Sequence, residues 1–280
     1  MVHLPLYTSD TSFRCHVLFW KTPMQNSEKK SKILEAAPAF LKDILPYISP
    51  RVFDLMDIPI VALNMGKLSY QYVFSKGVKS LSKRLEPLLP KTICFDENAK
   101  EVITKEEQGE AILELYFSQI LSKEQVFLDL RPSRFQVERG KIKWVPNGLF
   151  CHFKNDFQQG LIDLYTGFYH DDDVLYERGL QAIGLIQETD SKDQRDQIKS
   201  IFKEHFGDHD QTSVKFEMKH FVDSFHQIFD HIFTEKKKLS DDFVYLGIYL
   251  VTLYLHLEKI NRPLDVRASF ERAFQKFNAM

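Results

Sequence analysis

The 280-residue chain lacks most of the short motifs that mark phosphate-binding and nucleophilic sites. It contains no G-x-G-x-x-G, no G-x-x-x-x-G-K and no G-x-S-x-G, so neither a phosphate cradle nor a nucleophile elbow is predicted. Its three cysteines, Cys15, Cys94 and Cys151, are far apart and have no C-x-x-C spacing. This pattern disfavours a structural zinc site and a disulfide framework, and it favours a reducing compartment.

Glycine is also scarce, with 11 residues, whereas 24 residues are phenylalanine and 44% are apolar. This composition favours a helix-rich interior packed with aromatic rings over a turn-rich β protein. The formal charge is −2. A dedicated nucleic-acid partner is therefore not expected, because it would require an excess of basic residues.

Long hydrophobic runs are absent as well. The longest, Phe243 to Leu257, is shorter than the roughly twenty residues that span a bilayer, so it is predicted to be a buried helix. The start, Met1-Val2-His3-Leu4-Pro5, has no basic head followed by an apolar run, and no secretory signal is expected. These features predict a cytoplasmic protein without a transmembrane segment.

Helical patterns cover most of the chain. Thr104 and Glu107 form a predicted capping box that opens a helix to about residue 121, with its apolar residues on one face. Alternation around Arg139-Gly140 predicts a hairpin over 135–145, and a short strand is predicted at 14–20. Asp156 and the run Asp171–Asp173 are expected to cap the two helices that follow the hairpin. Predicted helices cover about 34–46, 50–56, 60–75, 77–86, 104–121, 156–169, 173–184, 191–206, 211–234 and 240–259.

The most informative segment is 126–135, Val-Phe-Leu-Asp-Leu-Arg-Pro-Ser-Arg-Phe, with Pro146-Asn147-Gly148 after it. It has the layout of a kinase catalytic loop and metal-binding turn. Such a site needs an aspartate to orient the accepting hydroxyl and further oxygen ligands for Mg²⁺. Asp129 is the aspartate, but Arg134 and Pro146 stand where the metal ligands are needed. Neither side chain coordinates a divalent cation, so no metal site is predicted.

This arrangement resembles the UbiB/AarF atypical kinase-like family, which carries His-Ala-Asp-Pro-His-Pro-Gly-Asn and later Asp-Phe-Gly. The similarity covers roughly 102–262. It includes apolar framework downstream, at Gly160–Tyr165, Gly179–Gly184 and Leu246–Leu253. The matching loop positions are Phe127-Leu128-Asp129, Leu130-Arg131-Pro132, Ser133-Arg134 and Pro146-Asn147-Gly148.

The resemblance implies the helical lobe of a kinase fold and an ATP-dependent activity tied to quinone or isoprenoid lipid metabolism. The family's Lys-x-Gly-Gln helix has a weak counterpart in Lys67-Leu68-Ser69-Tyr70-Gln71. Residues 1–101 show no β-rich lobe, strand-borne lysine or phosphate-covering loop. The prediction is a mainly α protein: an irregular helical region at 1–101, then a UbiB-type, protein-kinase-like helical lobe with one small β-hairpin at 102–280.

Asp129 has two interpretations. It either orients a hydroxyl nucleophile as a residual catalytic residue, or it caps its turn and pairs with Arg131 or Arg134. These two arginines are also candidates for contact with an anion such as a nucleotide phosphate or lipid headgroup, because a guanidinium fork suits phosphate. Solvated surface charge is the simpler explanation for them.

Other clusters have simpler structural explanations. His205 and His209 have metal-ligand spacing, and further metal-capable side chains stand at His170, Asp171–Asp173, Asp208 and Asp210. Gly207 is expected to end that helix before His209. Cys151 and His152 are adjacent, which disfavours a catalytic pair. An aromatic stripe is expected to form core, or to border an apolar pocket if its rings leave space; it comprises Phe216, Phe221, Phe225, Phe229 and Phe233.

Three functional hypotheses remain open. The first is a catalytically inactive, pseudokinase-like protein that binds a partner protein or an apolar, isoprenoid-like ligand, with no cofactor. The second is a residual ATP- and Mg²⁺-dependent UbiB-type kinase or ATPase that uses Asp129. The third is a helical interaction scaffold unrelated to kinases. Peripheral contact with a membrane is compatible with the first, through a basic run such as Lys236–Lys238.

Overall fold

The computed structural model is mainly helical with a few small β-sheets, which confirms the predicted mainly α class. It describes residues 39–48, 55, 57–75, 77–95, 104–138, 141–207, 213–234 and 239–279. All of them belong to one compact unit, Ala37–Met280. The predicted strand at 14–20 and nearly all of the predicted helix at 50–56 lie outside the described residues.

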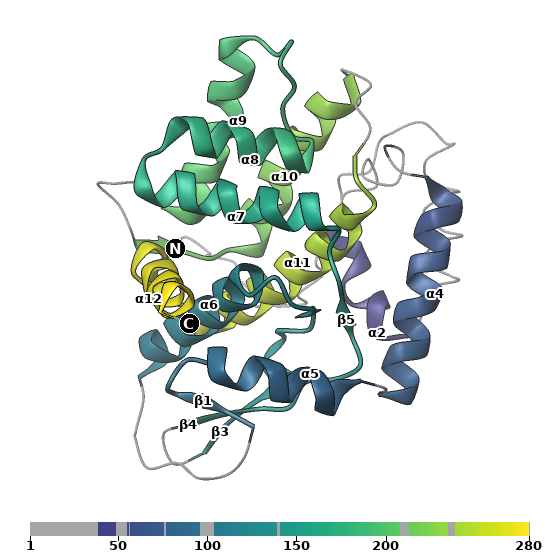
Figure 1. Cartoon of the computed structure of the whole chain (residues 1–280), viewed down its shortest axis with the longest axis vertical. Coiled ribbons are helices and arrows are strands. Elements are labelled where there is room, and N and C mark those ends of the chain that lie inside the picture. Colours follow the sequence, from purple (N-terminus) through teal and green to yellow (C-terminus); the bar gives the residue numbers. More distant parts are fainter. Residues whose placement is uncertain are drawn as a thin grey trace, which may run out of the picture. The chain divides into compact units, whose positions relative to one another are not determined.

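Most helices follow the predicted order with small shifts at their ends (Figure 1). Two predictions are wrong in part: the described part of 34–46 forms a four-residue α-helix and a 3-10 turn, and the helix predicted over 211–234 starts at Met218, after a short strand at 213–215. The α-helices are α2 (Ala39–Lys42), α4 (Ile58–Phe74), α5 (Val78–Leu85), α6 (Lys105–Leu121), α7 (Asn155–His170), α8 (Asp173–Ile183), α9 (Lys192–Phe206), α10 (Met218–Thr234), α11 (Asp242–Ile260) and α12 (Val266–Asn278). Three short 3-10 helices are η1 (Leu45–Tyr47), η2 (Glu86–Leu88) and η3 (Pro132–Arg134).

The strands are short and pair mostly across long sequence distances. They are β1 (Ile93–Cys94), β2 (Val126–Phe127), β3 (Phe135–Glu138), β4 (Lys141–Trp144), β5 (Phe150–Cys151), β6 (Ser213–Lys215) and β7 (Pro263–Asp265). The predicted hairpin is confirmed, because β3 pairs antiparallel with β4. Strand β1 adds to it in parallel, and β2–β5 and β6–β7 form two antiparallel pairs.

Of the three helix caps predicted from the sequence, two are present and one is wrong. The Thr104–Glu107 capping box is present, and Asp172 caps α8 by accepting a hydrogen bond from the Leu175 amide at 2.9 Å. The predicted cap at Asp156 is wrong. Helix α7 starts after Lys154, without a side-chain cap, and Asp156 lies in its first turn. There its charge still favours the positive end of the helix dipole.

Helix α12 was missing from the sequence-based prediction. Asp265 caps it by accepting from the Ala268 amide at 2.9 Å, and its inner face buries Val266, Phe270 and Ala273. This face packs against α6. Helix α6 is therefore buried on nearly all sides from Ala111 to Leu121, rather than on one face as predicted.

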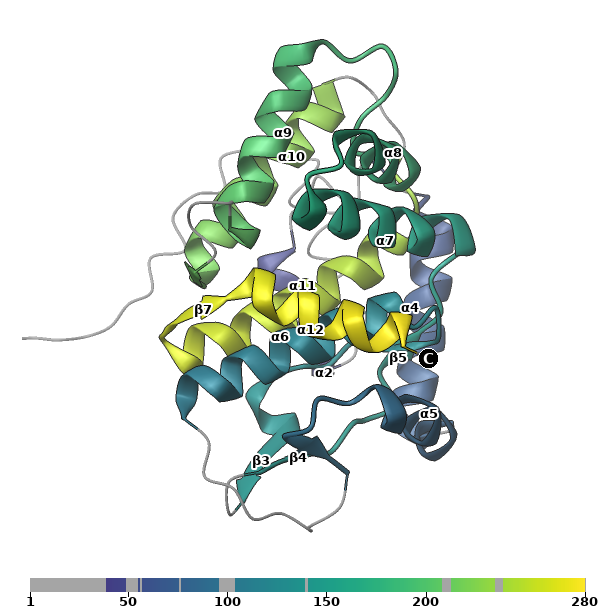
Figure 2. The ribbon, with the colours of Figure 1, turned by 60° about the vertical axis from the view of Figure 1, so that its left-hand side comes forward.

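Helix α11 forms the centre of the core. In both ribbon views it lies between the group of α7 to α10 and the sheet of β1, β3 and β4 (Figure 1, Figure 2). Within the described residues, it is the helix long and apolar enough to cross a membrane, but 78% of that stretch is buried inside the fold. This burial agrees with the predicted core helix over 243–257.

Helices α7 and α8 approach closely through glycines. A Cβ placed on Gly179 would lie 2.6 Å from Leu164 Cα and 2.7 Å from the Gly160 carbonyl oxygen. Real side chains do not make such contacts, so the crossing depends on the missing Cβ. Both glycines belong to the framework segments that carry the family resemblance.

Candidate functional site

The segment 128–134 lies between β2 and the β3–β4 hairpin, and α11 holds its backbone. The Thr252 hydroxyl donates to the Leu128 carbonyl at 2.6 Å and accepts from the Leu130 amide at 3.2 Å. His256 Nδ1 lies 2.8 Å from the Leu130 carbonyl oxygen. Burial lowers the pKa of His256 to about 4, so its ring is neutral near pH 7. These contacts from α11 hold the backbone of the segment at Leu128 and Leu130.

Asp129 is the buried carboxylate of this segment, and its two oxygens are fully engaged. The Arg131 guanidinium donates from Nε to Oδ1 at 2.8 Å and from Nη2 to Oδ2 at 2.7 Å. The Arg131 amide also donates to Oδ1, at 3.2 Å. This bidentate, charge-assisted pair is a strong form of ion pair, and the hydrogen bonds raise the pKa of Arg131. Asp129 is therefore ion-paired with Arg131, one of the two arginines predicted as its partner.

The turn 146–148 meets the segment at the same carboxylate. Asn147 Nδ2 donates to Asp129 Oδ2 at 2.7 Å, and Asn147 Oδ1 accepts from the Leu149 amide at 2.9 Å. The two parts of the predicted layout are thus neighbours in space. The side chain that joins them is an amide donating to a carboxylate, rather than a second carboxylate sharing a cation.

Arg134 adds a second positive charge beside Asp129. Its Nε lies 3.8 Å from Asp129 Oδ2 and has no hydrogen-bond partner, although it is buried. Asp129 therefore has two guanidinium groups beside it, and the exposed carboxylate of Asp43 lies on the far side of Arg131. A divalent cation at Asp129 would meet both guanidinium groups, which repel it.

Helix α4 packs directly over the turn. A Cβ placed on Gly148 would lie 2.6 Å from the carbonyl carbon of Gln71 and 2.8 Å from Tyr72 Cα. Asp43 also reaches Arg131, at 3.8 Å. Residues from before position 101 therefore cover the segment that carries Asp129.

Replacing Gly148 with alanine should destabilise the protein by about 2 kcal/mol or more, because the new methyl group meets backbone atoms that cannot rotate away. Gly66→Ala is the matched control. Gly66 lies on α4, and a Cβ added there has nothing within 4 Å. This alanine should therefore stabilise the protein by about 0.5–1 kcal/mol through helix propensity. Urea unfolding of both variants measures the two free energies. Equal stabilities would show that α4 does not pack on the turn.

The described members of the histidine and acidic clusters do not come together as a metal site. Helix α9 ends at Phe206, and Gly207 follows with a positive φ of 84°, so the predicted break is confirmed. Asp208, His209 and Asp210 lie outside the described residues. Among the described residues, no group of three or more His, Cys, Asp or Glu side chains is arranged to hold a metal ion.

Cys151 and the aromatic stripe serve the core. Cys151 is buried on β5, and burial raises the pKa of its thiol, which disfavours a reactive thiolate. Phe221 and Phe229 are buried, and the cavity beside the stripe measures about 30 Å³. Ligand pockets usually measure about 300–1,000 Å³. An isoprenoid chain therefore does not fit beside the described part of the stripe.

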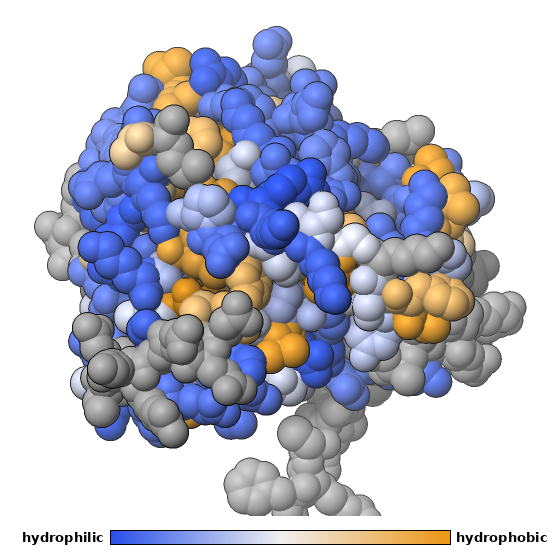
Figure 3. Space-filling model, turned by 60° about the horizontal axis from the view of Figure 1, so that its bottom comes forward, coloured by the Kyte–Doolittle hydropathy of each residue, from blue (hydrophilic) through white to orange (hydrophobic). Residues whose placement is uncertain are grey.

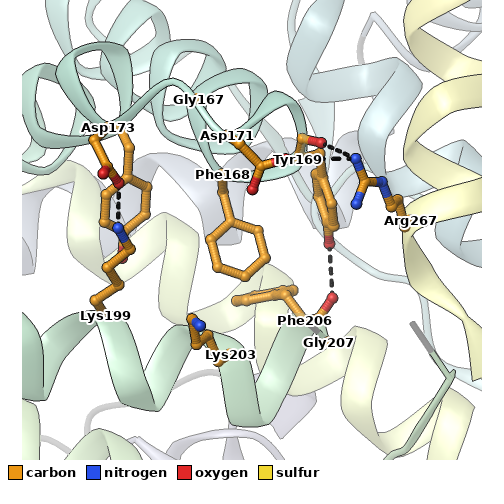
Figure 4. Close-up of a pocket in the computed structure, with 11 residues that line it drawn as sticks. Gly167, Phe168, Tyr169, Asp171, Asp173, Lys199, Lys203, Phe206, Gly207 and Arg267 are labelled. Atoms are coloured by element: carbon orange, nitrogen blue, oxygen red, sulfur yellow. Dashed lines mark hydrogen bonds and ion pairs between the residues drawn. The ribbon is translucent and has the colours of Figure 1, made fainter. Parts of the chain in front are cut away.

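A polar cavity that the sequence-based prediction missed lies between α7, α8, α9 and α12 (Figure 4). It measures about 170 Å³. Lys199 forms an ion pair with Asp173, and Arg267 donates to the Tyr169 carbonyl at 2.7 Å and lies 3.7 Å from Asp171. These internal pairs and the small volume indicate a structural role. The i,i+4 pair Lys199 and Lys203 is visible in the sequence, but Arg267 comes from a helix that was missed.

A wider groove of about 580 Å³ lies between α6 and α12. Within it, Arg272 contacts Glu110 at 3.1 Å and Glu114 at 3.0 Å. These ion pairs join the two helices. They explain the groove as an open surface between two packed elements.

Comparison of the chain with known proteins returns no matching family model and no matching curated protein. A function for this chain must therefore be inferred from the geometry around Asp129 and from the surfaces of the fold.

Proposed function

We propose that this chain is a catalytically inactive, pseudokinase-like protein that acts by binding a partner. The observation that carries the proposal is the carboxylate of Asp129, which is buried and fully occupied by Arg131 and Asn147. A catalytic aspartate must keep an oxygen available for the accepting hydroxyl. In this chain that oxygen is used to join two segments of the fold.

The electrostatics support the same proposal. Phosphoryl transfer relies on cations and fixed dipoles that stabilise the developing charge, and Mg²⁺ is the usual cation. Arg134 and Pro146 supply no metal ligand, and α4 covers the turn. A kinase-like ancestry of the UbiB type accounts for the convergence of 127–134 with 146–148, and loss of the metal ligands accounts for the ion pair that replaces them.

Addition of ATP with Mg²⁺ should leave the melting temperature of the protein unchanged. A ligand that binds only the folded state at one hundred times its Kd stabilises by about 2.7 kcal/mol, which a thermal-shift assay detects readily. Titration of Mg-ATP up to millimolar concentration, with Mg²⁺ alone as the control, tests this. A saturable, nucleotide-dependent increase would overturn the proposal. If the increase disappeared in Asp129→Asn, the ATP-dependent hypothesis would replace it.

A further inference from the structure

Helix α4 presents an unusual surface. Among the described residues, five of the eight large apolar side chains that are exposed lie on this one helix. They are Ile60, Leu63, Tyr70, Val73 and Phe74, with exposed fractions of 41% to 69%. Figure 3 shows apolar side chains gathered along the edge of the molecule that α4 forms.

The spacing shows that this is one face. Residues 60, 63, 67, 70 and 74 recur every three or four positions, which places them on one side of a helix. Val61 and Leu68 on the opposite side are buried. The helix is therefore attached to the fold by one side and carries its apolar stripe on the other. We call the exposed stripe of Ile60, Leu63, Tyr70, Val73 and Phe74 the α4 face.

Basic residues are in excess around the α4 face. Residues 58–85, which include α4 and α5, contain five basic residues and no acidic residue. Asp57 and Glu86 flank this range, and Arg84 is paired with Glu124 at 3.2 Å, so the lysines carry the excess. Lys67 is exposed within the stripe, and Lys79 and Lys83 are exposed on α5. Lysine can extend its ammonium group past a buried aliphatic stem.

We propose that the α4 face is a docking surface for an anionic phospholipid bilayer. Apolar and aromatic side chains next to an excess of lysines are the combination that binds the interface of such a membrane. The tyrosine–phenylalanine pair at Tyr70 and Phe74, with ring centroids 4.6 Å apart, suits the boundary between headgroups and acyl chains. This inference does not depend on whether Asp129 is catalytically silent.

A second copy of the chain fits the α4 face less well. The stripe is centred on Lys67. Pairing with another α4, either parallel and in register or antiparallel about its centre, would place Lys67 against the same lysine of the other copy. Buried like charges oppose such pairing. An anionic surface removes this conflict.

Flotation of the full-length protein with phosphatidylcholine vesicles, with or without phosphatidylserine, tests the proposal. The protein should float with the phosphatidylserine vesicles, and more strongly at low salt. Leu63→Ser with Phe74→Ser should weaken partitioning about tenfold or more. Val137→Ser with Val174→Ser, which alters apolar side chains exposed elsewhere, should leave it unchanged.

The charge contribution has its own pair of variants. Lys79→Gln with Lys83→Gln should weaken binding to phosphatidylserine vesicles about tenfold or more. Lys192→Gln with Lys259→Gln, which makes the same change of net charge at exposed positions elsewhere, should have little effect. Circular dichroism and melting temperature establish that each variant folds.

Two results would overturn the proposal. One is wild-type protein that stays unbound on vesicles of either composition. The other is binding that survives the α4 changes but is lost in the control variants. If sedimentation instead showed a dimer that Leu63→Ser with Phe74→Ser dissociates, with no vesicle binding, the α4 face would be an interface between two copies. Phe74→Trp gives a direct readout, since its emission should shift to the blue on vesicles and that of Val174→Trp should not.

Discussion

Replacing Asp129 with alanine should destabilise the protein by about 3–5 kcal/mol, because it leaves the Arg131 guanidinium in a mostly buried position without its counter-ion. The Asp129 side chain is 1% exposed and that of Arg131 is 16% exposed, so solvent cannot replace the lost contact. Asn147 Nδ2 also loses its acceptor. Chemical denaturation of wild type and variant measures the difference.

A double-mutant cycle separates the ion pair from other effects of the substitution. Asp129→Ala combined with Arg131→Met should cost less than the sum of the two single changes, since the double variant leaves neither charge unpaired. Asp173→Ala is the matched control. Its partner Lys199 and its own side chain are 36% and 75% exposed, so its loss should cost less than about 1 kcal/mol. Equal costs at Asp129 and Asp173 would contradict a structural role for Asp129.

Asp129→Asn distinguishes the functional hypotheses. A residual catalytic aspartate would lose ATP hydrolysis in Asp129→Asn with a modest change in stability, because catalytic groups are seldom chosen for stability. If Asp129 is structural, Asp129→Asn should lower the free energy of unfolding, and the wild-type protein should show no ATP hydrolysis. Parallel measurement of unfolding and of phosphate release under the same conditions therefore tests both hypotheses in one experiment.

Acid should destabilise the protein through two buried histidines. Burial lowers the pKa of His205 from 6.5 to about 3, with a contribution from nearby His220, and that of His256 from 6.5 to about 4. The unfolded chain therefore binds more protons than the folded chain below pH 6.5. The stabilising contribution is complete above pH 6.5 and falls as the pH decreases, by about 1.4 kcal/mol per pH unit for each histidine.

Between pH 6.5 and 4, each histidine should cost about 3 kcal/mol. His205 Nδ1 lies 2.7 Å from the Tyr254 hydroxyl, and its Nε2 is buried without a hydrogen-bond partner, so a proton added to Nε2 finds no acceptor in the folded state. Urea unfolding across this range measures the slope. His205→Gln and His256→Gln should each make the slope shallower, whereas His152→Gln, at an exposed position, should not. A slope unaffected by either buried substitution would contradict the assignment.

Local sequence predicted those features that depend on a few neighbouring residues. Thr104 and Glu107 satisfy each other's backbone donors within one turn, and the Asp172 side chain accepts from the Leu175 amide at the start of α8. Both helix starts could therefore be predicted. The retained Asp129 and the two missing metal ligands were also visible in the sequence. The identity of a side chain decides whether it can coordinate a cation.

Other features depend on contacts between distant segments. Strand β1 has two residues and pairs with β4 almost fifty positions later, which no local pattern indicates. The partner of Asp129 was left open between Arg131 and Arg134, and Asn147 was not considered. Its approach depends on how 146–148 folds back against 128–134. Helix α12 had an amphipathic pattern and an aspartate cap, and attention to that pattern could have found it.

The sequence by itself determined the helical class, the presence of Arg134 and Pro146 where metal ligands are needed, and the basic character of 58–85. Those properties follow from composition, short-range spacing and side-chain chemistry. Only the tertiary structure decided that Arg131 and Asn147 occupy Asp129, that α4 covers the turn, and that its other side remains exposed. These facts depend on which distant surfaces pack together, because a helix with apolar residues on both sides can bury either one.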